Sequence, residues 1–397
     1  MLAKARVVTW QDFLVAARVF AVAMTLTVTM VQLGWRAQEA NGSGVVSFPA
    51  GMHVANSATP GYGSTPLANW DSDWYYLIAR RGYFYDGNPL RQQNVAFFPA
   101  FPLASGILWK TFGGAWSTWA LAISWICHFC FLAGLHALAR AVALPAGRAE
   151  AAVWLAGLSP PALFGYAAYP TSLIALSCTL ALLFLQRRAW LAAGLAAGLA
   201  TASGSLGIAA AVVVSGTVLL ARAAGRTTTS TALVSAAFSF SGVAAFSTYL
   251  WWRFGDPLAY ASVQAAWQKP TDATDRLLRL ITLEPVRHAV ARLADNPVFA
   301  IAGLVVTAMA VAAVIAWRRL PLAVATYTAL ALILAFLASA GGTGTFGSLA
   351  RIAYSATPAY LALALLLPPR AARLGVVVLA AGFALFAYRF GAGHFVQ

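Results

Sequence analysis

Stretches of apolar residues, separated by short polar turns, recur along almost the whole chain. A helix needs about 20 mostly apolar residues to cross the hydrocarbon core of a bilayer. Segments of this kind lie near residues 12–35, 117–139, 150–169, 171–186, 189–203, 205–221, 230–252, 297–317, 320–340, 351–368 and 372–389. In lipid, backbone groups must satisfy one another, which a helix achieves within one segment. The pattern predicts an all-α polytopic membrane protein, with residues 1–397 forming one integral membrane domain of about 11 transmembrane helices.

Basic residues fall in the turns between these segments and predict an orientation. They occur as Lys4/Arg6, Arg140/Arg148, Arg187/Arg188, Arg222/Arg226, Arg318/Arg319 and Arg370/Arg373. If every segment crosses, all of these turns lie on one side, which the positive-inside rule makes cytoplasmic. One alternative stays open, because Ser203-Gly204-Ser205 interrupts residues 189–221. That stretch is either two crossings or one kinked helix followed by a re-entrant piece.

Two long polar stretches, 36–116 and 253–296, are extracytoplasmic loops in this topology and hold nine of the eleven acidic residues. The first is rich in Gly, Ser, Asn and Pro to about residue 68 and is predicted to be loop there. A short helix is then predicted over 70–82, and an apolar piece broken by two prolines over 95–110. Neither is long enough to span, so both are predicted to lie in the membrane interface.

Composition agrees with a membrane protein and excludes other classes. Hydrophobic residues make up 61% of the chain and charged residues 9%, against roughly 25% charged in a soluble domain. The net charge of +15 lies largely in the turns, which favours a topological role over nucleic-acid binding. Cys127-His128-Phe129-Cys130 resembles half a metal site, but no second cluster completes it, so these cysteines are expected to be structural. Residues 13–35 are too long for the core of a signal peptide, which predicts an uncleaved first span.

Asp71 and Asp73 are two carboxylates at the edge of the bilayer, where acidic side chains are costly and usually functional. Nucleotide sugars and ATP are not available on the outer side, so group transfer there needs a donor carried in the membrane, such as a polyprenyl-phosphate sugar. Its phosphate departs as a stable anion. A carboxylate acting as general base on an acceptor hydroxyl, with a cation near the phosphate, is then sufficient. Asp71 is the predicted base and Arg351 the predicted cation, and direct displacement inverts the anomeric centre.

A structural alternative for the two carboxylates stays open. Asp71 and Asp73 would then cap the helix over 70–82 and complement its dipole. They could also bind a divalent cation, but the sequence offers no third outer ligand. The chemistry above requires no metal and no other cofactor.

Several motifs occur in a fixed order along the chain. They are Trp70-Asp71-x-Asp73, Ile78-Ala79-x-x-Gly82-Tyr83-x-Tyr85, Asn94-x-Ala96-Phe97-Phe98-Pro99-x-Phe101-Pro102-Leu103, Leu158-Ser159-Pro160, Ala168-Tyr169-x-x-Ser172-Leu173, Phe254-Gly255-Asp256-Pro257-Leu258-Ala259, Gln264-Ala265-Ala266-Trp267 and Ser348-x-x-Arg351 with Pro358. In this order they resemble the PIG-V-type GPI mannosyltransferases, the second mannosyltransferase of GPI assembly, and their bacterial relatives.

The resemblance implies a GT-C glycosyltransferase fold, a polyprenyl-phosphate mannose donor and an inverting transfer that makes an α-mannoside. It places the catalytic aspartate at Asp71, with Asp73 as its acidic neighbour. The residues that it suggests for substrate binding are Trp70, Trp74, Tyr83, Asn94, Phe98, Pro99, Gln264, Trp267 and Arg351. The expected partners are the lipid-linked donor, a glycan, lipid or protein acceptor, and membrane lipids. The composition, rich in Ala, Arg and Gly, suggests the inner membrane of a bacterium, with the active site on the extracytoplasmic face.

The chain also departs from the family pattern. Thr171 stands where the family usually has an acid after the tyrosine, Gly204 stands where it often has an arginine, and Ile352 follows Arg351 in place of tyrosine. These departures leave the donor sugar and acceptor open and keep a catalytically lapsed scaffold subunit as an alternative. A lipid-linked sugar transporter or flippase is a second alternative, although its charges would be expected near the bilayer midplane, where Arg18 is the chief example here.

Overall fold

The structure is a computed structural model that describes residues 7–40, 61–63, 65–267, 297–339 and 349–394, with a few single positions between 268 and 296. Some sequence predictions lie outside these residues: the loop over 41–60, most of 268–296, the pair Lys4/Arg6, and Ser348. Across the described ranges the regular elements are all helical. The predicted all-α class is therefore confirmed.

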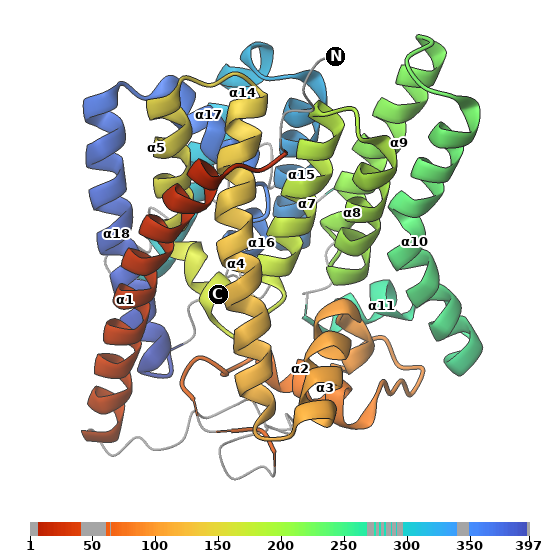
Figure 1. The fold of residues 1–397 in the computed structure, drawn as a ribbon. Helices are drawn as coiled ribbons and strands as arrows, with labels where there is room; N and C mark the ends of the chain where they lie inside the picture. Colours follow the sequence, from red (N-terminus) through yellow and green to blue (C-terminus); the bar gives the residue numbers. More distant parts are fainter. Residues whose placement is uncertain are drawn as a thin grey trace.

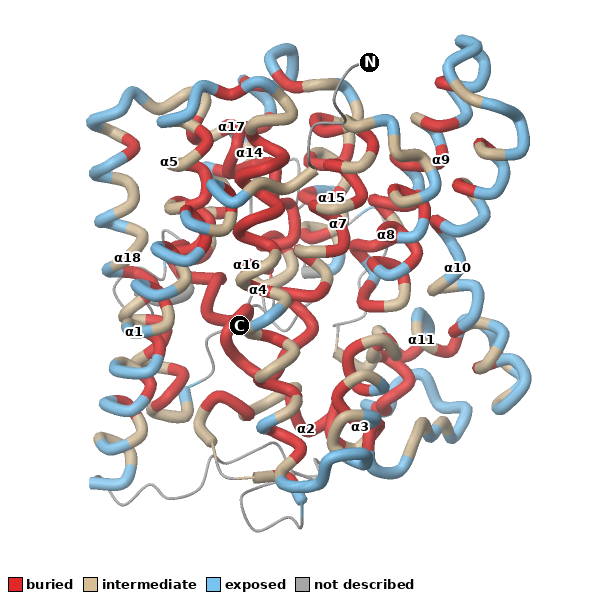
Figure 2. The backbone as a smooth tube through the Cα atoms, viewed as in Figure 1, coloured by how far each residue is buried: buried red, intermediate tan, exposed pale blue. Residues whose placement is uncertain are grey.

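The long helices form a bundle (Figure 1). They are α1 (Trp10–Ala40), α4 (Trp116–Ala141), α7 (Thr171–Gln186), α10 (Thr229–Phe254), α14 (Pro297–Ala316), α15 (Leu322–Ser339) and α18 (Pro369–Gly391). Within the described residues, five helices are long and apolar enough to cross a membrane alone, and a bent pair makes a sixth if it counts as one span. The outer faces of α10 and α18 carry many exposed residues (Figure 2), among them large apolar side chains such as Trp252 and Leu374. Exposed apolar helix faces of this kind suit contact with lipid.

Two predicted spans are broken instead of continuous. The stretch 150–169 contains α5 (Ala146–Gly157), the 3₁₀ turn η2 (Pro160–Ala162) and the short α6 (Leu163–Tyr166), which meets α7 at a bend of 102°. The stretch 351–368 contains α16 (Leu349–Ala353) and α17 (Pro358–Leu366). Proline explains both breaks, since it removes a helix hydrogen bond and favours the first turn of a new helix. Pro160 and Pro161 begin η2, and Pro358 begins α17.

Residues 189–221 form two separate helices, α8 (Trp190–Ser203) and α9 (Gly207–Ala223), which pack on each other and on α10. The stretch is therefore two helices and not one kinked helix, and each is shorter than the helices that are long enough to cross a membrane alone. Glycines allow the close packing of α8 on α10: a methyl group at Gly198 would overlap the Phe238 carbonyl oxygen, and one at Gly242 would overlap the Gly198 carbonyl oxygen. Small residues at helix contacts let membrane helices approach in this way.

The turns that carry the basic residues lie at one end of the bundle. In Figure 1 the α4–α5, α9–α10 and α17–α18 connections lie at the upper edge. The helices α2 (Ser72–Arg81) and α3 (Ala100–Phe112) lie at the opposite edge. The remaining short elements, η1 (Asn94–Ala96), α11 (Ala259–Ser262) and η3 (Val263–Trp267), pack together near them, and η4 (Trp317–Arg319) follows α14. The predicted grouping of the basic turns is thus present in the fold.

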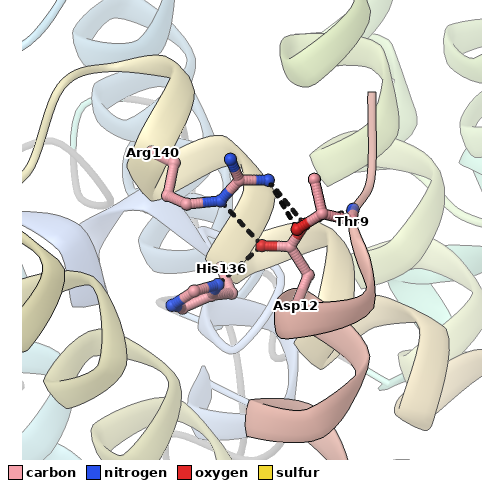
Figure 3. A network of polar contacts seen from close by, with 4 residues as sticks. All are labelled: Thr9, Asp12, His136 and Arg140. Atoms are coloured by element: carbon pink, nitrogen blue, oxygen red, sulfur yellow. Dashed lines mark hydrogen bonds and ion pairs between the residues drawn. The ribbon is translucent and has the colours of Figure 1, made fainter. Parts of the chain in front are cut away.

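A buried carboxylate ties α1 to α4 near the end of the bundle where α4 terminates (Figure 3). Asp12 accepts hydrogen bonds from Arg140 Nη2 at 2.5 Å and from Arg140 Nε at 2.8 Å. It also lies 2.6 Å from His136 Nδ1 and accepts from the Thr9 backbone N–H at 2.6 Å and the Thr9 hydroxyl at 2.9 Å. Both carboxylate oxygens are satisfied inside the protein, so Asp12 is a structural acid.

Candidate active site

Asp71 and Arg351 form an ion pair, although 280 residues separate them in the sequence. Asp71 directly precedes α2, and Arg351 lies on the short helix α16. Each side chain is 17% exposed, so the pair is shielded from solvent but not sealed off. Opposite charges in such a setting interact more strongly than they would at an open surface. The structure brings together the predicted base and the predicted phosphate cation.

The Asp71 carboxylate does not cap α2. Asp71 occupies the N-cap position, but its side chain makes no cap hydrogen bond, and an Asp in a capping role would accept one from a backbone N–H two or three residues later. Its carboxylate instead contacts Arg351. The structural alternative for Asp71, a helix cap, is therefore disfavoured by the geometry.

Two aromatic rings lie beneath the Arg351 guanidinium. Its central carbon is 5.3 Å from the centroid of the Tyr169 ring and 6.0 Å from that of Phe164. The broken helix pair supplies both rings, because Phe164 is in α6 and Tyr169 is in the bend before α7. Guanidinium groups within about 6 Å of a ring centroid are attracted to its face. The break between Tyr166 and Thr171, which contains Pro170, thus helps to build a platform for the arginine.

The Tyr169 hydroxyl connects this platform to the segment before α2. It accepts a hydrogen bond from the Asp71 backbone N–H at 3.2 Å and donates one to the Asn69 carbonyl at 3.0 Å. Further bonds join the same two segments: the Ser72 hydroxyl donates to the Ala168 carbonyl at 3.2 Å, and the Ala168 N–H donates to the Leu67 carbonyl at 2.9 Å. Sequence reasoning did not assign Tyr169 or Phe164 to the site. The available signals were the motif Ala168-Tyr169-x-x-Ser172-Leu173 and Pro170, which marks a break in an apolar segment.

Trp70 has a left-handed backbone conformation, with φ of 61°. A bulky residue rarely adopts this conformation, and such strain of about 1–3 kcal/mol persists only where the surroundings impose it. Trp70 directly precedes Asp71, so the unusual turn decides where the Asp71 carboxylate points. This strain beside an ion-paired carboxylate fits a functional position.

Asp73 faces a different part of the structure from Asp71. Residues two apart in a helix do not share a face, and Asp73 is 6% exposed and lies beside Tyr62. Burial raises the pKa of the Tyr62 hydroxyl well above its usual range, and the nearby Asp73 carboxylate raises it further. Over the described part of the chain, no group of three or more His, Cys, Asp and Glu side chains could hold a metal ion.

Trp74 and Trp267, both predicted to bind substrate, meet in one aromatic cluster. Trp74 stacks on Phe97 with ring centroids 5.6 Å apart, and Trp267 packs edge-on against both, at 6.1 Å and 5.9 Å. Gln264, three residues before Trp267, donates from its side-chain amide to the Ala96 carbonyl at 3.4 Å. The two outer stretches are therefore joined next to α2.

The other predicted binding residues hold the loop between α2 and α3 in shape. Asn94 accepts from the Phe84 N–H at 2.9 Å and donates to the Gly82 carbonyl at 3.0 Å. The Tyr83 hydroxyl donates to the Phe97 carbonyl at 2.8 Å. Phe98 packs on Phe246 and Tyr260, and Pro99 directly precedes α3. A role in substrate binding stays a prediction for these residues.

The chain has distant structural similarity to several solved proteins. No protein-family model matches it, and no curated protein matches its sequence. It is similar to ArnT from Cupriavidus metallidurans bound to undecaprenyl phosphate, with 12% identity and a TM-score of 0.49 over 96% of this chain and 76% of that chain. It is also similar to the oligosaccharyltransferase of Archaeoglobus fulgidus in the apo form, with 12% identity and a TM-score of 0.44 over 96% of this chain and 56% of that chain.

A third structure is AglB, the oligosaccharyltransferase of Archaeoglobus fulgidus, in complex with an inhibitory peptide and a dolichol-phosphate. The identity is 13% and the TM-score is 0.43, over 94% of this chain and 56% of that chain. The chain therefore spans just over half the length of the two oligosaccharyltransferase chains. The resemblance to PIG-V-type mannosyltransferases stays a prediction.

Proposed function

We propose that the protein is an integral membrane glycosyltransferase of the GT-C type. It transfers a sugar, for which we propose mannose, from a polyprenyl-phosphate donor to a glycan, lipid or protein acceptor. The observation that carries the proposal is the ion pair of Asp71 and Arg351, a shielded carboxylate and guanidinium in contact. Such a pair supplies both groups that transfer from a lipid phosphate needs.

The reaction uses the two side chains in different roles. The Asp71 carboxylate accepts the proton of an acceptor hydroxyl while the oxygen of that hydroxyl attacks the anomeric carbon. The bond between that carbon and the phosphate oxygen breaks, and its electron pair leaves with the phosphate. Arg351 donates hydrogen bonds to the phosphate oxygens as their negative charge grows, which stabilises the transition state. Attack opposite the leaving group inverts the anomeric centre, so a β-linked donor gives an α-linked product.

The donor phosphate and the Asp71 carboxylate compete for the same guanidinium. Arg351 bonds to Asp71 in the structure, and phosphate is a strong partner for arginine because its oxygens match the fork of N–H donors. When the donor binds, its phosphate takes the place of Asp71 at Arg351. The carboxylate is then released toward the acceptor hydroxyl.

The location of the pair supports an extracytoplasmic active site, and we propose that the membrane is a bacterial inner membrane. The α2 end of the bundle, where Asp71 lies, is opposite the end that collects the basic turns (Figure 1). Positive residues favour the cytoplasmic side. A polyprenyl-phosphate donor suits a site at the opposite surface because its lipid tail stays in the membrane. The cluster of Trp74, Phe97 and Trp267 next to α2 is the proposed contact for the apolar face of a sugar ring.

Replacement of Asp71 tests the proposal. Asp71→Asn keeps the shape of the side chain but removes its basicity, so transfer should fall about 100-fold or more, the usual contribution of a general base. The measurement is transfer of labelled mannose from undecaprenyl-phosphate mannose, by purified protein in lipid vesicles, to acceptors in an extract of cell envelopes. Other polyprenyl-phosphate sugars are assayed in parallel to identify the donor.

Asp86→Asn is the matched control. Asp86 lies in the same outer loop and pairs with Arg91, but it is exposed, so this variant should transfer at the parent rate. Folding of both variants is checked by thermal unfolding in detergent. Transfer by Asp71→Asn at the parent rate would remove Asp71 from the mechanism and with it the proposal.

A further inference from the structure

We propose that Tyr169 is the positioning residue of this site and sets the base and the phosphate cation relative to each other. The inference rests on the proposed function, since it assigns a role within that reaction. The inference goes beyond the proposed function because Tyr169 touches neither the acceptor nor the donor in that mechanism. Two independent contacts carry it, one through the hydroxyl and one through the ring.

The hydroxyl contact holds the backbone on both sides of Trp70. The Tyr169 hydroxyl accepts a hydrogen bond from the Asp71 N–H and donates one to the Asn69 carbonyl. These two residues flank Trp70, whose backbone is left-handed. A strained conformation persists only when neighbouring contacts impose it. The phenol is such a contact, because relaxation of Trp70 would pull at least one of the two bonds apart. Tyr169 thus fixes the direction in which Asp71 leaves the turn.

The ring contact holds the cation. The Arg351 guanidinium lies over the Tyr169 ring at 5.3 Å, and the attraction of a cation to an aromatic face does not depend on the Asp71 carboxylate. When the donor phosphate takes the place of Asp71, the ring still keeps the guanidinium in position. Phe164 adds a second, longer contact at 6.0 Å.

Further contacts with the surrounding protein hold both the ring and the backbone of Tyr169. It is fully buried, and its ring packs against Phe164 at 5.5 Å and against Tyr75 at 6.3 Å. The Ser124 hydroxyl of α4 donates to the Tyr169 carbonyl at 3.1 Å. Because these contacts fix Tyr169, it can hold Asp71 and Arg351 in place. A side chain without such contacts would instead move when Asp71 and Arg351 move.

The hydroxyl and the ring predict different kinetic defects. Tyr169→Phe keeps the ring and removes both hydrogen bonds to the backbone, so kcat should fall about 10-fold, as expected for a lost buried hydrogen bond, while the donor KM stays unchanged. Tyr169→Leu also removes the aromatic face, so the Kd for undecaprenyl phosphate should rise roughly 10-fold. Both are measured with the full-length protein in vesicles, using undecaprenyl-phosphate mannose for transfer and undecaprenyl phosphate for binding.

Tyr360→Phe is the control for loss of a buried phenol. Tyr360 is as buried as Tyr169, and its hydroxyl bonds to Ser159 at 2.9 Å, but it has no part in the proposed machinery. This variant should lower the unfolding temperature and leave kcat and KM unchanged. A purely structural Tyr169 would behave in the same way, so the separation of kcat from KM distinguishes the two roles.

Two results would overturn the inference while the proposed function stands. One is a kcat for Tyr169→Phe within twofold of the parent when Asp71→Asn is inactive. The other is an unchanged Kd for undecaprenyl phosphate in Tyr169→Leu. If Tyr169→Leu does not fold, the kcat of Tyr169→Phe decides alone. An active Asp71→Asn variant would instead refute the proposed function itself.

Discussion

At the scale of single residues, the site consists of charged groups that the sequence indicates and aromatic groups that it does not. Asp71 stood out because acids are rare beside apolar segments, and Arg351 stood out because it is the first residue of the apolar segment 351–368. Their contact agrees with the expectation that base and cation act on one donor. Tyr169 belongs to one of the ordered motifs and Phe164 looks like an ordinary apolar-segment residue. The sequence indicates no contact of either ring with Arg351, since a cation–ring contact leaves no pattern in the chain.

The ion pair of Asp71 and Arg351 predicts that loss of the carboxylate weakens transfer but strengthens binding of the lipid phosphate. Because Asp71 occupies the guanidinium that the phosphate needs, Asp71→Asn should bind undecaprenyl phosphate at least about 5-fold more tightly, as removal of a competing like charge does. Binding is measured on protein in vesicles with labelled undecaprenyl phosphate. Arg351→Ala should lose binding, and Asp86→Asn should match the parent. Equal affinity in Asp71→Asn and the parent would show that Asp71 and the lipid phosphate do not share Arg351.

At the scale of elements, prolines and glycines decide how the apolar segments become structure. Hydropathy alone predicted continuous spans over 150–169 and 351–368, yet each is broken, next to Pro160 and Pro358. These breaks produce the short helices α6 and α16, which carry Phe164 and Arg351. A further break at Pro170 produces the bend before α7, which holds Tyr169. Continuous helices would present a smooth apolar surface. The predicted helix over 70–82 is present as α2, although it is buried on most sides instead of resting on the surface.

The glycine contacts between α8 and α10 give a prediction about stability. Gly198→Ala places a methyl group against the Phe238 carbonyl oxygen, so the variant should lose about 1–3 kcal/mol of unfolding free energy, as overpacking does. Gly216→Ala is the matched control, because a methyl group there meets nothing within 4 Å. Thermal unfolding in detergent compares the two variants with the parent. A Gly198→Ala variant as stable as Gly216→Ala would mean that the helices are not packed this closely.

At the scale of the whole molecule, the positions of the basic turns and of the exposed apolar helix faces indicate the same placement in the membrane. The basic turns collect at one end of the bundle and α2 with α3 at the other, while the outer faces of α10 and α18 are apolar enough for lipid (Figures 1 and 2). The Asp12 network joins α1 to α4, which fixes the first helix against the centre of the bundle. Breaking a buried ion pair from one side typically costs about 3–5 kcal/mol, so this contact is a strong constraint on the arrangement.

The orientation in the membrane can be tested directly with single cysteines. Asn88 is exposed in the loop after α2, and Thr227 is partly exposed in the turn between α9 and α10. In a variant whose native cysteines are replaced by serine, a membrane-impermeant maleimide should label Asn88→Cys in intact cells and Thr227→Cys only after permeabilisation. The reverse pattern would place Asp71 on the cytoplasmic side, where the proposed donor chemistry has no basis.

The sequence by itself determined the helical membrane class of the protein and indicated two charged candidate residues, Asp71 and Arg351. Apolar segments and basic turns specify a helical membrane protein and its grouping of turns, because hydropathy and charge act on each segment locally. Only the tertiary structure decided which residues meet: Asp71 with Arg351 across 280 positions, and both with Tyr169. Those contacts depend on where broken helices bend and how closely glycines let helices pack, and neither is a property of one segment.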